Sequence, residues 1–282
     1  MAQETSTVTT ETRYAVVTGG NKGIGFEICR QLASNEITVV LTARDENKGL
    51  EAVQKLKDSG FSDHLLFFHQ LDVLDPKSIA ALADFIKTQF GKLDILPDQK
   101  QFNWHEIATQ NLESAKKCLK TNYYGAKGMV EALAPHLQLS DSARIVNVSS
   151  TAGLLQNIPN QWAKGLLSDG TNLTEERVDE VVNQFLKDFK DGLLETKGWP
   201  IHMSAYIIGK AAMNAYTRIL AKKYPNFLVN CVCPGFCKTD ITTNLGILTA
   251  AQGAENVVRL ALLSKDESTS GCYFIKEQMV DF

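Results

Sequence analysis

The chain has 282 residues, of which 29 are basic and 32 acidic, so its net charge is −3 and its pI is about 6.0. This balance argues against nucleic acid held through a dense basic surface, and we expect no nucleic-acid partner. With 44% hydrophobic and 22% charged residues, the composition excludes a disordered or fibrous chain and is typical of a globular protein.

The amino-terminal segment, MAQETSTVTTETR, has no apolar core and one basic side chain. It therefore matches neither a secretory signal nor an Arg-rich transit peptide, and we expect a flexible tail over residues 1–12. No apolar run elsewhere approaches the roughly 18 residues of a membrane span. These features predict a cytoplasmic protein that makes no membrane contact.

Short β-branched runs alternate with longer helical patterns along the rest of the chain. We expect strands at residues 14–18, 37–42, 65–71, 93–96, 144–148 and 227–233. Helices are expected at residues 26–34, 48–58 and 78–90, the last opened by a Ser cap and closed at Gly91. Strands separated by helices pair in parallel through right-handed crossovers. The pattern predicts an α/β fold with a Rossmann-type, doubly wound parallel sheet, in one domain over residues 13–282.

A glycine-rich turn links the first strand to the first helix. Glycines there allow a tight turn and let the backbone approach a pyrophosphate, whose charge meets the free N–H groups and the positive end of the helix. Such a turn alone is weak evidence, but its position between strand and helix favours a dinucleotide site. The candidate cofactor-binding residues are Thr18, Gly19, Asn21, Lys22, Gly23, Ile24 and Gly25.

The end of the second strand should distinguish the two nicotinamide dinucleotides. An acidic side chain there would accept hydrogen bonds from a free ribose 2′-hydroxyl, but this strand ends in Ala43-Arg44. Arg44 and Lys22 can both place positive charge against a 2′-phosphate. The pair therefore favours NADP(H), although either cation alone also fits a solvated surface.

A second group of polar residues combines Ser149-Ser150, after the fifth strand, with Tyr206 and Lys210. Tyr206 and Lys210 are four residues apart and would share one helical face. A tyrosine, whose ordinary pKa is about 10, donates a proton to a carbonyl only if its anion is stabilised, and a neighbouring ammonium does this. Tyr-x-x-x-Lys alone is common on surface helices, so its meaning depends on the other motifs.

Together these motifs resemble the short-chain dehydrogenase/reductase family, from about Tyr14 to the carboxyl terminus. The likeness is closest to the plant branch of monomeric, carbonyl-reductase-like members, in RYAVVTGGNKGIGFEICRQLA, TNYYG, RIVNVSS, NAYTRILAKKYP and VNCVCPGF. The resemblance implies an NADP(H) cofactor and an oxidoreductase that reduces an apolar small-molecule ketone, a terpenoid or alkaloid, to the alcohol. One member with an acidic residue in place of the tyrosine reduces a carbon–carbon double bond, so Tyr206 favours ketone chemistry.

The same resemblance implies roles for single residues. Tyr206 would be the general acid, Lys210 its electrostatic partner, Ser150 the hydroxyl that orients the carbonyl, and Asn122 the holder of a water for proton relay. Asn122, Tyr206 and Lys210 would also contact the cofactor. Further cofactor contacts are implied, near the adenine and beside the nicotinamide, for Asp72, Val73, Pro234, Gly235 and Thr239. Capping or turn chemistry is the alternative for Asn122, Asp72 and Thr239.

A long stretch separates Ser150 from Tyr206, and we place an insertion at about residues 154–203. Within it, Thr174 would cap a helix with one apolar stripe, made of Val178, Val181, Val182, Phe185, Leu186 and Phe189. By resemblance this helix covers the surface that other members use to dimerise, so we expect a monomer. Four apolar residues could line a substrate pocket or pack in the core: Ile158, Trp162, Trp199 and Met203.

The chain departs from the family after Leu96. Relatives continue with Val-Asn-Asn-Ala-Gly and a long loop, whereas this chain has Pro97-Asp98-Gln99-Lys100. Pro97 cannot donate a ladder hydrogen bond, so we expect the fourth strand to end before it. The chain can still cross back through a helix at about residues 103–120. A lesser departure is Gly209, where relatives have Ser and where Gly weakens a helix slightly.

The six cysteines are too few for a disulfide framework and indicate a reducing compartment. The grouping of Cys231, Cys233 and Cys237 allows zinc, but Cys-x-Cys in an apolar run is more typical of a buried strand, so we expect no metal. Two functions remain open. The retained catalytic candidates favour the ketone reductase, and the missing Asn-Asn-Ala-Gly motivates the alternative, a catalytically impaired cofactor-binding protein.

Overall fold

The computed structural model describes residues 12–99, 111–264, 266 and 269–282. The tail expected at residues 1–12 lies almost wholly outside these ranges, as does the part of the helix expected at 103–120 that precedes residue 111. The strands of the described chain form one sheet in the order β3-β2-β1-β4-β5-β6-β7-β8, parallel throughout except for the last pair. The doubly wound α/β fold is thus confirmed. The strands are β1 Tyr14–Val17, β2 Thr38–Ala43, β3 Leu66–Gln70, β4 Ile95–Asp98, β5 Arg144–Val148, β6 Leu228–Cys233, β7 Tyr273–Ile275 and β8 Gln278–Val280.

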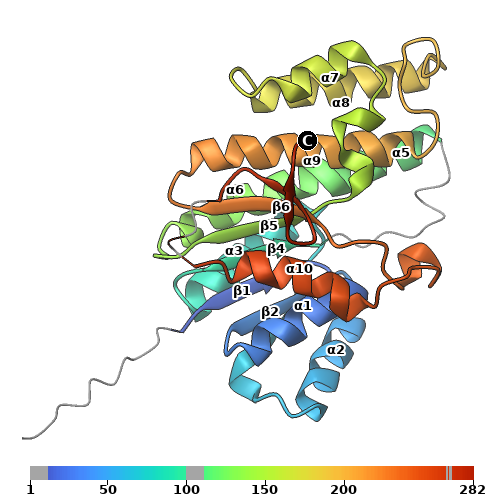
Figure 1. Cartoon of the computed structure of the whole chain (residues 1–282). Helices are drawn as coiled ribbons and strands as arrows, with labels where there is room; N and C mark the ends of the chain where they lie inside the picture. The colour runs from blue at the N-terminus through green and yellow to red at the C-terminus, as the bar shows by residue number, and fades with distance from the viewer. Residues whose placement is uncertain (1–11, 100–110, 265, 267–268) are drawn as a thin grey trace, which may run out of the picture.

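Helices cover both faces of this sheet (Figure 1). They are α1 Gly23–Ser34, α2 Glu46–Asp58, α3 Pro76–Gln89, α5 Leu112–Leu119, α6 Gly125–Leu137, α7 Gln161–Ser168, α8 Glu175–Lys190, α9 Ser204–Lys223 and α10 Ala250–Ala261. Neighbouring strand residues face opposite sides. Val16 packs with α3, α6 and α9 on one face, and Val17 packs with α1, α2 and α10 on the other. Among the described helices, none is both long and apolar enough to cross a membrane.

The predicted elements lie within a few residues of the observed ones, but the cap of α3 and the last two strands differ from the sequence expectation. Helix α3 begins at Pro76 and is capped by Asp75, whose side chain accepts a hydrogen bond from the Lys77 N–H. Ser78, the predicted cap, lies inside the helix, where its hydroxyl accepts from the Asp72 N–H instead. The sequence also gave no sign of β7 and β8, because three-residue strands are too short for an alternating pattern to be visible.

The prediction that the fourth strand ends before Pro97 is wrong. Strand β4 continues to Asp98 and pairs with β5 at every position from Ile95 onwards. On the other side, the Pro97 carbonyl accepts a hydrogen bond from the Thr18 N–H at 3.3 Å. The N–H that proline lacks would point to this same side, towards β1, where β4 has a single registered pair, Ala15 with Ile95. The proline therefore destabilises the sheet little, because the N–H that it lacks would face β1, with which β4 forms the shorter ladder.

The insertion forms a separate layer, in which α7 and α8 lie on α9 and α5, on the side away from the sheet (Figure 1). The Thr174 side chain accepts a hydrogen bond from the Arg177 N–H, so the predicted cap of α8 is confirmed. Four stripe residues are buried in the core, whereas two are partly buried: Val178, Val181, Val182 and Phe185, then Leu186 and Phe189. The stripe is therefore a packing surface.

The insertion residues proposed for a pocket divide between core and surface. Trp199 is 2% exposed, and its Nε1 donates a hydrogen bond to Asp188 Oδ2 at 2.8 Å. Ile158 is also buried, so the core alternative holds for both residues. Trp162 is 42% exposed and meets Trp199 edge-on, with the ring centroids 6.5 Å apart.

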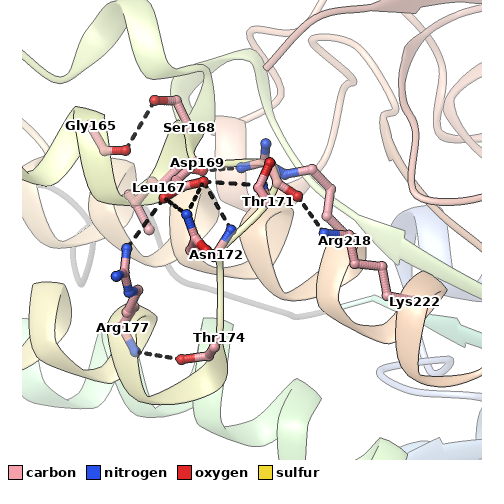
Figure 2. A network of polar contacts seen from close by, with 11 residues as sticks. Gly165, Leu167, Ser168, Asp169, Thr171, Asn172, Thr174, Arg177, Arg218 and Lys222 are labelled. Carbon is pink, nitrogen blue, oxygen red and sulfur yellow. Dashed lines mark hydrogen bonds and ion pairs between the residues drawn. The ribbon is translucent and has the colours of Figure 1, made fainter.

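Polar contacts fasten the insertion at two places. In the loop before α8, Asp169 accepts hydrogen bonds from the N–H groups of Thr171 and Asn172 and pairs with Arg177 at 3.3 Å (Figure 2). In the same view, Arg218 and Lys222 of α9 donate hydrogen bonds to the carbonyls of Leu167 and Gly170. At the start of α8, Glu175 lies between Lys127 of α6, at 2.9 Å, and Lys223 of α9, at 3.2 Å.

The Glu175 contacts predict acid-sensitive stability. Partial burial raises the pKa of Glu175, but Lys127 and Lys223 outweigh it and hold that pKa below its ordinary value. A depressed folded-state pKa stabilises the fold above the unfolded pKa, and this contribution is lost as the pH falls through the folded value. We expect Glu175→Gln to lower the free energy of unfolding by about 1 kcal/mol at neutral pH.

Urea unfolding at neutral pH and at about pH 4, near the ordinary pKa of glutamate, measures this effect. The deficit of Glu175→Gln should shrink at the lower pH. Glu180→Gln, an exposed position on the same helix, is the control and should match the wild type. A deficit of equal size at both pH values would contradict the role of the two lysines.

Candidate active site

The glycine-rich turn lies at the carboxyl end of β1 and leads into α1. Gly19 and Gly23 have positive φ angles of 63° and 57°, which L side chains rarely adopt. A Cβ at Gly25 would lie 2.2 Å from the Gly19 carbonyl oxygen, so the helix can begin this close to the turn only with glycine there. No side chain of the described residues caps the first N–H groups of α1, and no acidic residue occupies its first turn. The turn therefore fits a pyrophosphate.

A cavity of about 250 Å³ opens beside this turn. It brings together six predicted cofactor residues from three separate segments: Thr18, Gly19, Asn21, Arg44, Asp72 and Val73. The Asp72 side chain also accepts a hydrogen bond from the Leu74 N–H at 2.9 Å, so the turn chemistry considered for it is present as well. Gln99, which sequence reasoning did not single out, lines the same cavity. Its position just beyond the carboxyl end of β4 could have indicated this, because open α/β sheets bind ligands at the carboxyl ends of their strands.

A second cavity, of about 230 Å³, lies on the other side of the turn and shares Gln99 with the first. It is lined by the other predicted residues Lys22, Gly23, Ile24 and Thr239. Lys22 Nζ lies 2.5 Å from Asp240 Oδ2, although both side chains are at least half exposed. Thr239 caps the short turn Asp240–Thr242. The two predicted cations thus line different cavities, and the charge of Lys22 already has a partner.

Thr18 connects the glycine-rich turn to the end of β4. Its hydroxyl lies 2.8 Å from Asp98 Oδ1 and 3.0 Å from the Gln99 carbonyl oxygen, and shares its proton between them. All three residues are buried. The chain therefore uses Asp98 and Gln99 to hold β4 against β1, at the place where the family resemblance implies an Asn-Asn-Ala-Gly segment.

Helix α9 brings Tyr206 and Lys210 to the carboxyl end of β5. Lys210 is 4% exposed, its Nζ donates a hydrogen bond to the Val148 carbonyl at 2.8 Å, and Nζ lies 5.8 Å from the centre of the Tyr206 ring. A Cβ at Gly153 would lie 2.7 Å from Lys210 Cβ. The glycine three residues after Ser150 is thus required for the helix to approach this closely.

Ser150 is the serine that contacts Tyr206. Burial raises the pKa of Tyr206 to about 12, and a hydrogen bond with Ser150 works against this rise. The phenol is therefore protonated at neutral pH. Ser149 faces elsewhere, since its hydroxyl lies 2.5 Å from Asn214 Oδ1 in the core. The geometry thus favours Ser150 over Ser149 as the orienting hydroxyl.

Asn122 is fully buried in a π-helical turn, Lys120–Tyr124, between α5 and α6. Its Nδ2 donates a hydrogen bond to the Cys118 carbonyl at 3.0 Å, and its Oδ1 has no hydrogen-bond partner within the described ranges. A Cβ at Gly209 would lie 3.1 Å from Asn122 Cβ. The departure at Gly209 therefore lets α9 pack closely on the asparagine.

The remaining predicted residues lie on the segment that follows β6. Gly235 has a positive φ of 89°, and the Pro234 carbonyl accepts a hydrogen bond from the Cys237 thiol. Cys231 and Cys233 are buried in β6, and all six cysteines are free thiols. In the part of the chain that the structure describes, no three His, Cys, Asp or Glu side chains are grouped as a metal site.

Comparison with known proteins gives consistent results. Residues 13–163 match the short chain dehydrogenase family. The chain is 55% identical to a (+)-neomenthol dehydrogenase from Arabidopsis thaliana, with 100% of both chains covered. It is 37% identical to carbonyl reductase [NADPH] 3 from Mus musculus, over 95% of this chain and 97% of that one. The structure of salutaridine reductase from Papaver somniferum matches with a TM-score of 0.87 at 50% identity, over 93% of this chain and 99% of that chain.

The first of these alignments spans 302 positions, more than the 282 residues of this chain. The neomenthol dehydrogenase therefore carries residues that this chain lacks.

The Thr18 contact predicts a loss of stability when its hydroxyl is removed. Thr18→Val keeps the side-chain shape but leaves two buried oxygens without this donor, so we expect a loss of about 1–3 kcal/mol in the free energy of unfolding. Urea denaturation measures it. Asp98→Asn keeps an acceptor oxygen for Thr18 and should lose much less. Equal stability of Thr18→Val and the wild type would show that β4 does not depend on this contact.

Proposed function

The chain belongs to the short-chain dehydrogenase family, and from this premise we propose that it is an NADPH-dependent oxidoreductase that reduces a ketone of an apolar small molecule, a terpenoid or alkaloid, to the alcohol. The names of its relatives support this substrate class, since neomenthol is a terpenoid alcohol and salutaridine an alkaloid ketone. The observation that carries the proposal is the arrangement of Ser150, Tyr206 and Lys210 at the carboxyl end of β5.

Each side chain then has a defined part in the reaction. When bound, the cofactor supplies the hydride for the carbonyl carbon. Tyr206 holds its proton at neutral pH and gives it to the ketone oxygen, and Ser150, within hydrogen-bond reach of the phenol, orients that oxygen. Lys210, fixed by the Val148 carbonyl, places a positive charge beside the phenolate that results. The Asn122 Oδ1 atom accepts a hydrogen bond from the water that returns the proton.

The choice of NADP(H) rests mainly on Arg44. Its exposed side chain lies at the end of β2 and lines the cavity of about 250 Å³. That strand does not end in an acidic residue, which would accept a hydrogen bond from a free ribose 2′-hydroxyl. Lys22 is paired with Asp240, so it contributes only when that pair opens. The name of the mouse relative, a carbonyl reductase that uses NADPH, supports the same choice.

The alternative, a catalytically impaired cofactor-binding protein, is the weaker proposal. It was motivated by the missing Asn-Asn-Ala-Gly segment, but Thr18, Asp98 and Gln99 make buried contacts at that place. We also propose a monomer, supported by the cover that α8 gives to α5 and α9, and a cytoplasmic location, supported by six free thiols.

Removal of the phenol hydroxyl tests the reaction. We expect Tyr206→Phe to lower kcat at least about 100-fold, the usual contribution of a general acid. NADPH oxidation is followed by absorbance with a panel of cyclic ketones that includes menthone, the ketone corresponding to neomenthol. Tyr224→Phe, a tyrosine stacked on Phe227 beyond the end of α9, is the control and should remain active. Full activity of Tyr206→Phe would disprove the mechanism.

Cofactor preference is tested by Arg44→Ala, alone and combined with Lys22→Ala. We expect the double variant to bind NADPH about tenfold more weakly or worse, since a charged contact to the 2′-phosphate is lost, while NADH binding changes little. Most of the loss should already be present in Arg44→Ala. Fluorescence titration with both dinucleotides gives the two dissociation constants. An equal loss for NADPH and NADH would refute contact with the 2′-phosphate.

A further inference from the structure

The π-helical turn that carries Asn122 is a rare local structure. Such a turn closes i→i+5 hydrogen bonds, one residue longer than those of an α-helix, and is frequent at functional sites. The Asn122 side-chain amide donates hydrogen bonds to the carbonyl and the thiol sulfur of Cys118, one turn earlier, at 3.0 and 3.3 Å. The position of its Oδ1 therefore depends on what holds residues 120–124.

The two residues after Asn122 are tyrosines that face the insertion. Tyr123 is fully buried, and its ring meets that of Tyr124 at 4.8 Å and that of Tyr216, on α9, edge-on at 5.9 Å. The pKa of Tyr123 and that of Tyr124 are both raised, chiefly by burial and next by the negative charge of Asp179 on α8. Tyr124 also lines one cavity together with side chains of α8, so the insertion lies beside the turn.

Helix α8 also makes ion pairs with the chain just beyond the turn. Lys127, in the first turn of α6, lies 3.5 Å from Asp179 and 2.9 Å from Glu175, which is one helical turn earlier on α8. The side chains are largely shielded from solvent, with 19% of Lys127, 30% of Asp179 and 17% of Glu175 exposed. Shielded charges attract each other more strongly than exposed ones. Asp179 therefore pairs with Lys127, three residues after the turn, and its charge also acts on the two tyrosines of the turn.

We propose that Asp179 is a positioning residue, through which α8 of the insertion fixes the π-helical turn and keeps the Asn122 side chain in place for proton relay. This inference rests on the proposed function, because it concerns how Asn122 serves Tyr206 and Lys210. With this positioning role the insertion has a second function, besides covering α5 and α9. Small displacements of a relay group are costly, since a shift of about 1 Å can lower a rate by orders of magnitude.

The test compares two aspartates of the same insertion. Asp179→Ala removes the carboxylate beside the turn, whereas Asp169→Ala breaks the loop network before α8 (Figure 2), which includes no residue of the turn. With menthone as the probe ketone and saturating NADPH, we expect Asp179→Ala to lower kcat about tenfold with little change in KM, and to raise the solvent deuterium isotope effect as proton transfer becomes slower. Asp169→Ala should keep kcat and the isotope effect near the wild-type values.

Further variants separate positioning from folding. Asp179→Glu keeps the charge and should restore most of kcat, and Asp179→Asn, of the same size, replaces Asp179→Ala if that variant does not fold. Thermal unfolding of every variant shows how much stability each change removes. A kcat for Asp179→Ala no lower than that of Asp169→Ala, or an unchanged isotope effect, would overturn the proposal.

A measurement without turnover distinguishes this inference from the proposed function. If the wild type reduces no ketone of the panel, the proposed function fails, and the side-chain amide signal of Asn122 in a ¹⁵N-resolved NMR spectrum remains as the readout. That signal is assigned as the one lost in Asn122→Asp. It should shift in Asp179→Ala and stay in place in Asp169→Ala. An unmoved signal in Asp179→Ala would refute the positioning role.

Discussion

The buried ammonium of Lys210 is the constraint on which the active site depends. A charge that is almost fully removed from water must be paired, and here the Val148 carbonyl at the end of β5 accepts its hydrogen bond. That carbonyl belongs to a strand in the middle of the sheet, with a neighbouring strand on each side, and Val148 itself is paired with β6. Two further side-chain contacts, from Ser149 to Asn214 and from Asn147 to Thr217, hold α9 against the same strand. The position of Tyr206 follows from this docking, because Tyr206 lies on the same helix as Lys210.

Features that depend on local sequence were predictable. The glycine-rich turn, the strand before it and the cap at Thr174 each follow from residues close together in the chain. The spacing of Tyr206 and Lys210 likewise places both on one helical face. The contribution of Ser150 could be assigned only by resemblance, and the structure adds the reason that Ser149 is engaged elsewhere.

Features that depend on distant segments were not predictable. Whether Pro97 ends a strand depends on which side its missing N–H faces, and this is known only when β1 and β5 are in place. The ion pair between Lys22 and Asp240 is likewise not predictable, because the turn of residues 240–242 that supplies the carboxylate is remote in sequence. The same holds for Thr18 and Asp98, which meet only across the β1–β4 contact. In each case, tertiary structure brings in a partner that no local pattern indicates.

The attachment of the loop before α8 has a consequence for sequence change. Arg218 holds the end of α7 by the main-chain carbonyl of Leu167, and Lys222 holds the loop by that of Gly170, a group that every amino acid possesses (Figure 2). The two hydrogen bonds themselves therefore do not depend on which side chains stand at positions 167 and 170. The Leu167 side chain is fully buried in the core, so position 167 is constrained by packing, whereas Gly170 is exposed and a Cβ there would meet open space. Sequence change is therefore tolerated at position 170, because Lys222 keeps its hydrogen bond to the main chain whichever residue stands there.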